Sequence, residues 1–158
     1  MLTQSLTFLL VTFFAANSFA CSCTELNESF KKRIKHNFER HDFILTGKVI
    51  AKEVVVHYCK NCTSSGDPVV YTIQIDKLYK GCVTTKLIEI VSSISEVSNG
   101  YNFKVGETYL INAFKSDYYS SKYKQIKTPY STGLCSRNKI FDDLARKHKR
   151  ILHKLVKS

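Results

Sequence analysis

Alternating hydrophobic and polar positions along the middle of the chain predict a β-sheet. Strands are expected at residues 43–56, 69–79, 87–93 and 107–114. The first of these is long and rich in β-branched side chains, with a kink expected at Gly47. The second alternates most regularly, and a Tyr- and Lys-rich stretch at residues 115–130 predicts a hairpin that supplies a fifth strand.

Apolar side chains recur every three or four residues on both sides of this β-rich region, which is the helical pattern. Within residues 24–42 the stripe consists of Leu26, Phe30, Ile34 and Phe38. After Cys135 it consists of Phe141, Leu144, His148, Ile151 or Leu152, and Leu155. A mostly β chain of about five strands with flanking helices is typical of the five-stranded OB-fold barrel, and the pattern shows no break that would divide it into two domains.

The first 20 residues have the character of a secretory signal peptide rather than of folded structure. They carry no charged side chain, and an apolar stretch from Leu6 to Ala16 precedes Ser18 and Ala20 at the small-residue positions of a cleavage site. A bacterial lipoprotein signal is the alternative, but Phe19 and the lack of basic residues disfavour it. Cleavage before Cys21 would leave residues 21–158 as one secreted, extracellular domain.

All six cysteines follow this predicted cleavage point, so three disulfides are expected in an oxidising compartment. They are Cys21, Cys23, Cys59, Cys62, Cys82 and Cys135. The spacing alone leaves their pairing open. Cys59 and Cys62 have C-x-x-C spacing, but they lie in a polar loop without a second pair nearby, which favours a structural bridge over a redox or zinc site. Asn27 and Asn61 match the N-glycosylation pattern.

The net charge of +11 predicts association with polyanions. Outside the cell these are heparan-like glycosaminoglycans rather than nucleic acid. The densest basic stretch lies on the polar face of the C-terminal helix: Arg146, Lys147, Lys149, Arg150, Lys154 and Lys157. A solvated helix face without a ligand is an equally good interpretation of this run.

The sequence Cys21-Ser22-Cys23 would form the new N-terminus after cleavage. The free α-amine of Cys21, which titrates near pH ~7.7–8.0, and its own carbonyl oxygen can form a five-membered chelate around a metal ion. A catalytic zinc keeps one coordination position open for such a ligand. The alternative is that Cys21 and Cys23 are only two structural half-cystines.

The order of motifs resembles the tissue inhibitor of metalloproteinases family and the wider netrin-like module. The chain would begin C-S-C, and residues 41–49 (HDFILTGKV), 71–81 (YTIQIDKLYKG) and 105–111 (VGETYLI) resemble the family's strands. Leu134 and Cys135, followed by an apolar helix pattern, resemble the family's cysteine that precedes a helix. The resemblance covers nearly all of residues 21–150.

This resemblance implies an OB-fold inhibitor of secreted, metzincin-type zinc endopeptidases. Cys21 would chelate the zinc of the protease, Ser22 would enter the specificity pocket, and Cys23 and Thr24 would lie alongside. The loop after the third strand, with Glu96, Val97 and Ser98, would also contact the protease. The resemblance further implies a disulfide between Cys23 and Cys135.

The chain departs from the family pattern at two places. The segment 95–100 lacks the family's partner for the first cysteine, so Cys21 would pair with Cys82, Cys59 or Cys62. Thr24 and Glu25 replace prolines of the family.

No H-E-x-x-H, nucleophile-elbow or phosphate-loop motif occurs, so we expect a monomeric inhibitor rather than an enzyme, without a cofactor of its own. The competing hypothesis is a non-inhibitory netrin-like module that binds sulfated glycans or a cell-surface receptor.

Overall fold

A computed structural model describes residue 23, residues 27–56, residue 64 and residues 66–157. The helices are α2 (Phe30–Arg40), α3 (Tyr118–Lys122) and α4 (Arg146–Leu155), with short 3-10 turns η1 (Glu96–Ser98) and η2 (Leu134–Ser136). The strands are β1 (Phe43–Val54), β2 (Pro68–Lys80), β3 (Leu87–Ser93), β4 (Thr108–Lys115), β5 (Tyr130–Ser131) and β6 (Lys139–Ile140). The predicted mostly β class with flanking helices is therefore confirmed.

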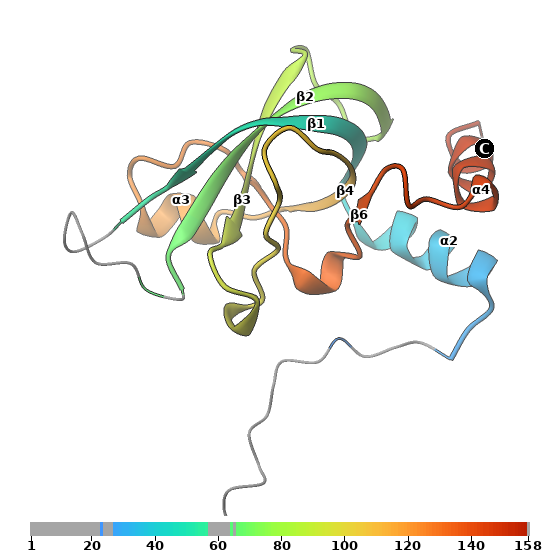
Figure 1. The fold of residues 1–158 in the computed structure, drawn as a ribbon, viewed down its shortest axis with the longest axis horizontal. Coiled ribbons are helices and arrows are strands. Elements are labelled where there is room, and N and C mark those ends of the chain that lie inside the picture. Colours follow the sequence, from blue (N-terminus) through green and yellow to red (C-terminus); the bar gives the residue numbers. More distant parts are fainter. Residues whose placement is uncertain (1–22, 24–26, 57–63, 65, 158) are drawn as a thin grey trace, which may run out of the picture.

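The sheet closes into a five-stranded barrel (Figure 1). The strand order is β1-β2-β3-β5-β4, and β1 also pairs with β4, which closes the barrel; β6 adds to the outer edge of β4. Strand β1 can serve two neighbours because irregularities in its register, one of them between Thr46 and Gly47, bend it. A Cβ at Gly47 would lie 2.6 Å from the carbonyl oxygen of Gln74, so a side chain there would collide with β2. The predicted kink at Gly47 is therefore confirmed.

The barrel interior is filled by side chains from alternating strand positions. Tyr71 and Ile73 of β2 are buried there, together with Leu45 of β1 and Ile111 of β4, and Phe103 from the β3–β4 connection packs among them. The alternation predicted for residues 69–79 thus reflects one side of β2 that faces the barrel interior.

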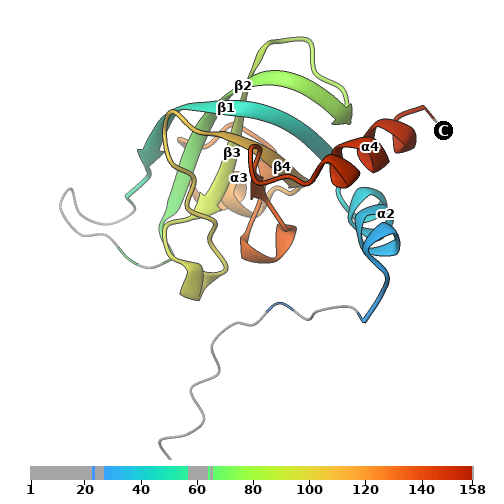
Figure 2. The ribbon, with the colours of Figure 1, turned by 45° about the vertical axis from the view of Figure 1, so that its right-hand side comes forward.

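A second apolar cluster lies outside the barrel, where α2 and α4 cover it. Ile44 and Leu110 point outward from β1 and β4 and pack against Ile34 of α2 and Leu152 of α4. The two helices lie next to each other at one end of the molecule in both ribbon views (Figures 1 and 2). Residues from the beginning and the end of the described chain thereby form one layer.

Two local expectations are wrong. The predicted hairpin within residues 115–130 is instead the short helix α3, and β5 is only two residues long, Tyr130–Ser131. The C-terminal helix begins at Arg146, so Phe141 and Leu144 precede it rather than occupying its first turns. Both residues still pack in the outer cluster, which explains why their spacing matched a helical stripe.

None of the helices within the described residues combines the length and apolar character needed to cross a bilayer.

Candidate functional site

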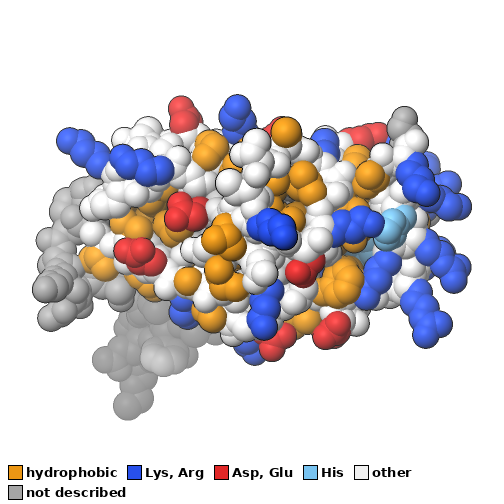
Figure 3. All heavy atoms as spheres, turned by 90° about the horizontal axis from the view of Figure 1, so that it is seen from above, with side chains coloured by type: hydrophobic (Ala, Val, Ile, Leu, Met, Phe, Trp, Pro, Cys, Tyr) orange, Lys and Arg blue, Asp and Glu red, His pale blue; other side chains and the backbone are white. Residues whose placement is uncertain are grey.

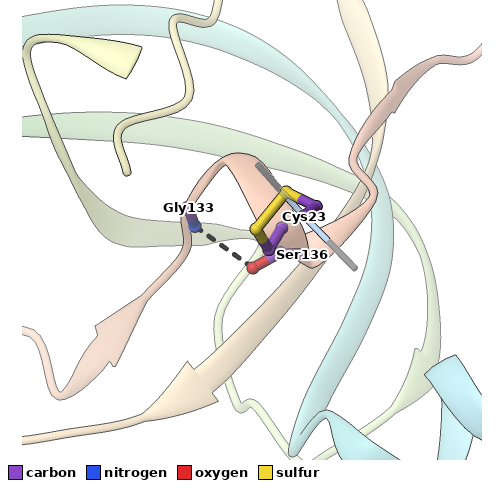
Figure 4. Close-up of a disulfide and its surroundings, with 4 residues drawn as sticks. Cys23, Gly133 and Ser136 are labelled. Carbon is purple, nitrogen blue, oxygen red and sulfur yellow. Dashed lines mark hydrogen bonds between the residues drawn. A yellow bond between two sulfur atoms is a disulfide. The ribbon is translucent and has the colours of Figure 1, made fainter. Parts of the chain in front are cut away.

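A disulfide joins Cys23, ahead of α2, to Cys135 in η2 (Figure 4). The two cysteines are 112 residues apart in sequence, and their Cα atoms lie 5.3 Å apart. The bridge predicted from the family resemblance is therefore confirmed. It fixes the N-terminal segment of the domain to a loop that immediately follows the barrel strand β5.

Buried polar side chains hold this loop against β4. The hydroxyl of Thr132 donates to the carbonyl oxygen of Asn112 at 2.6 Å. The side chain of Asn138 accepts from the backbone N–H of Asn112 at 2.8 Å and donates to the hydroxyl of Thr132 at 2.9 Å. Because all three residues are buried, breaking one bond would leave a desolvated polar group. The network therefore gives the loop that carries Cys135 a single fixed path.

The loop containing η1 lies directly against the loop containing η2. The N–H of Leu134 donates to the carbonyl oxygen of Asn99 at 3.0 Å. This approach requires a glycine at position 133, since a Cβ there would lie 2.5 Å from the same oxygen of Asn99. Asn99 itself has a φ of 59°, a left-handed conformation that asparagine tolerates better than most residues. Cys23, bonded to η2, therefore shares one edge of the molecule with η1.

Of the residues predicted to contact a protease, the structure brings Cys23, Glu96, Val97 and Ser98 to this edge, which we call the disulfide edge. Val97 is 82% exposed, the highest value among the exposed large hydrophobic residues in the described part of the chain. Glu96 is also exposed, and Ser98 is half-buried. The edge thus presents an apolar tip beside the anchored N-terminal segment.

A polar cavity of about 580 Å³ opens beside the disulfide edge. Cys135 and Ser98 line it from the two loops, and Tyr118 lines it from α3. Arg40 is the single charged residue among the described residues that line it, and most of the others carry hydroxyl groups. The cavity can therefore accept polar groups of a partner that docks on this edge.

Several predicted residues fall outside the described part of the chain: Cys21, Ser22, Thr24, Cys59, Asn61 and Cys62. Cys82 has an exposed thiol with no disulfide to another described cysteine. Cys21, for which Cys82, Cys59 and Cys62 were the predicted partners, lies outside the described residues, so its pairing stays a prediction. Asn27, the first candidate glycosylation site, is exposed. Within the described residues, no cluster of three or more His, Cys, Asp or Glu side chains is arranged to hold a metal ion.

A basic surface lies on the α2 and α4 layer. Five of the six cationic residues predicted to bind polyanions are exposed, and Figure 3 shows Lys and Arg side chains gathered at the end of the molecule where α4 lies in Figure 1. Lys149 is the half-buried exception, with its Nζ 3.8 Å from the centre of the Phe141 ring. Sequence reasoning missed that α2 adds Lys31, Lys32 and Lys35, although the run of lysines at the start of α2 was a visible signal.

His148 of α4 is the most strongly perturbed histidine at this end. Burial lowers its pKa to about 4, and the positive charge of Lys139 contributes in the same direction. The imidazole packs edge-on against Phe30 of α2, with ring centroids 5.8 Å apart. At neutral pH it is therefore uncharged, and it belongs to the contact between the two helices.

No protein-family model matches the chain, and no curated protein sequence matches it.

Proposed function

We propose that this protein is a secreted inhibitor of zinc metalloendopeptidases, built on a netrin-like OB-fold barrel. The α-amine and carbonyl oxygen of Cys21 in the mature chain would chelate the zinc of the protease, and Ser22 would enter the specificity pocket. The observation that carries the proposal is the Cys23–Cys135 disulfide, because it anchors the N-terminal segment beside an exposed loop.

The anchor matters because of how little chain precedes it. Two residues span at most about 7 Å between Cα atoms, so the α-amine of Cys21, one bond farther out, would stay within about 9 Å of the Cα of Cys23. A tethered end loses less conformational entropy on docking than a free one, and more of the metal-binding energy then appears as affinity. A free N-terminal α-amine has a pKa of about 7.7–8.0, so a useful fraction is neutral and able to bind zinc near pH ~7.4.

The loop of η1 would supply a second contact on the same protease. Val97 offers an apolar side chain that water surrounds in the free protein, and covering it would favour association. Glu96 and Ser98 flank it and would face the rim of the cleft, with Thr24 on the other side of the anchor. The contact would be divided between two segments that the hydrogen bond from Leu134 to Asn99 holds together.

The test uses the secreted protein with its N-terminus read by intact mass and N-terminal sequencing. Adding one alanine before Cys21, or acetylating its amine, should weaken inhibition of a zinc metalloendopeptidase at least about 100-fold, or about 2.8 kcal/mol. The control carries one alanine at the C-terminus and should inhibit like the unmodified protein. Undiminished inhibition by the extended or acetylated protein would remove the chelation mechanism.

The α2 and α4 layer favours a second candidate function, binding of sulfated glycans outside the cell. The proposal that α4 binds polyanions gains support from α2, which packs beside α4 and adds the exposed residues Lys31, Lys32 and Lys35. The variant Lys147→Gln/Arg150→Gln should elute from heparin at clearly lower salt, because exposed charges act over about one Debye length. The control Lys52→Gln/Lys104→Gln removes the same charge elsewhere. If the two double variants elute at the same salt concentration, heparin binding depends on net charge alone and the proposed surface is excluded.

A further inference from the structure

A small cavity lies between α2, α4 and the start of β6, separate from the disulfide edge. Its volume is about 110 Å³, and its walls include Arg33 of α2, Arg137 and Lys139 around β6, and His148 of α4. Three cationic side chains and an imidazole, contributed by three segments far apart in sequence, therefore border one cavity. We call the cavity that these four residues border the cationic cavity.

Among the described residues no ion pair involves these cations, although Asp143 borders a second cavity together with Lys139. No carboxylate lines the cavity, and the ion pair found within the described residues, Lys35 with Glu39, lies on the surface of α2. The Nε atom of Arg33 is buried and has no hydrogen-bond partner in the described part of the chain. Buried polar groups are almost always hydrogen-bonded, so an unpartnered guanidinium nitrogen calls for an explanation. The field of Lys139 also reaches the cavity, since it helps to lower the pKa of His148.

The position of Arg137 is fixed by the interior of the protein. Its backbone has a φ of 58°, a left-handed conformation, at the C-cap of η2. Its carbonyl oxygen accepts a hydrogen bond from the side chain of Asn112 at 3.2 Å, and the neighbouring Asn138 is bonded to the same residue. Arg137 is therefore held at the wall of the cavity by its position at the end of η2 and by its bond to Asn112.

We propose that the cationic cavity binds one tetrahedral oxyanion, a sulfate or phosphate group. Guanidinium groups match the oxygen geometry of such anions and form charge-assisted hydrogen bonds with them. The cavity has room for one such group, since its volume of about 110 Å³ is several times the ~10–15 Å³ that a cavity needs to hold one water molecule. The anion, with a charge of about −2, would offset most of the charge of Arg33, Arg137 and Lys139 and thereby tie α2 to the segment that leads into β6.

This proposal does not rest on protease inhibition. It also differs from the binding of glycans to the exposed lysines. Those lysines form a broad surface, whereas the cavity offers a single binding position for one anionic group. The bound group can be a free inorganic ion or the sulfate ester of a glycan. The two sources share the same chemistry at the cavity, and they differ in whether a single ion is sufficient for binding.

The experiment follows the Nε–Hε signal of Arg33 and the ring signals of His148 by NMR in the full secreted protein. Sodium sulfate, sodium phosphate and a sulfated heparin disaccharide are titrated separately at pH ~6, with sodium chloride at matched ionic strength as the reference. Saturable shifts of both signals are expected with at least one oxyanion probe. Bound anion should also raise the pKa of His148 by about one unit, because it stabilises the imidazolium.

Two variants separate the cavity from the general charge of α2. Arg33→Gln should weaken binding of the effective probe about tenfold, as expected for the loss of a charge-assisted hydrogen bond. Lys32→Gln removes the same charge from an exposed neighbour and should change binding less than about twofold. Saturation by the inorganic ions identifies a free-ion site, and saturation by the disaccharide alone identifies a glycan site. Shifts no larger than those with chloride, or equal weakening in both variants, would overturn the proposal.

Discussion

The contact between η1 and η2 predicts that Gly133→Ala will destabilise the disulfide edge. Gly133 has a φ of −152°, which alanine adopts freely, so backbone strain is not the reason. The added Cβ would instead lie 2.5 Å from the carbonyl oxygen of Asn99 and 2.9 Å from its side-chain nitrogen. The two loops must then separate, which stretches or breaks the bond from the N–H of Leu134 to the same carbonyl oxygen.

The magnitude follows from three contributions. Overpacking in a tight contact costs about 1–3 kcal/mol, and loss of one hydrogen bond costs about 0.5–1.5 kcal/mol. Against these, replacing glycine reduces the conformational freedom of the unfolded chain and stabilises by about 0.4–1 kcal/mol. The net expectation is a loss of about 2 kcal/mol in the free energy of unfolding, or a drop of about 4–8 °C in Tm for a domain of this size.

Urea unfolding of the oxidised protein, followed by circular dichroism, measures this loss. The matched control is Gly66→Ala, because a Cβ at position 66 meets nothing within 4 Å. It should be neutral or slightly stabilising. If the free energies of unfolding of the two variants agree within about 0.5 kcal/mol, the two loops do not approach as closely as described. The contact would then not be available to position Cys23.

The remaining predictions concern the anchor, the exposed tip and pH. Replacing Cys23 and Cys135 together by serine should lower the free energy of unfolding by up to about 4.7 kcal/mol, the loop-entropy value for ~100 residues, and an unchanged urea midpoint would contradict it. Val97→Asp should weaken protease inhibition while changing stability by less than about 0.5 kcal/mol, and unaltered inhibition constants would exclude this contact. Because the pKa of His148 is lowered from 6.5 to about 4 in the folded protein, stability should fall as pH drops through that window. The free energy of unfolding of His148→Gln, measured at several pH values, should fall less steeply with decreasing pH than that of the unmodified protein.

The barrel was largely predictable because its strands carry their own signal. Alternation along β2 placed Tyr71 and Ile73 on one face, and that face is the barrel interior. The prediction for residues 115–130 was wrong because tyrosine is enriched in strands, whereas here two of the tyrosines lie in the helix α3. A tertiary contact stabilises the helix instead. The hydroxyl groups of Tyr119 and Ser93 lie 2.8 Å apart and hold α3 against β3.

The start of the C-terminal helix was misjudged for a similar reason. Phe141 and Leu144 have helical spacing; Leu144 is buried in the same cluster as the helix, and the partly buried Phe141 packs against it. The backbone around them belongs to β6 and a turn, because the buried side chain of Asn138 is bonded to Asn112 of β4. Hydrophobic periodicity indicates which side chains are buried, but it does not by itself determine whether they belong to a helix, a strand or a turn.

The candidate sites were less predictable because each depends on contacts between distant residues. Cys135 drew attention through its chemistry, and its partner Cys23 was inferred from a family resemblance. Gly133 carries no local signal, since its importance arises from Asn99 in another loop. The cationic cavity likewise joins Arg33 to His148 across most of the chain.

One short segment connects the two candidate sites. Cys135 faces the disulfide edge, and two residues later Arg137 borders the cationic cavity. The network of Thr132, Asn112 and Asn138 beneath them sets the position of both. A substitution in that network would therefore disturb the anchor and the anion site together. Separate tests of the two sites must use residues outside the network, and Val97 and Arg33 meet this requirement.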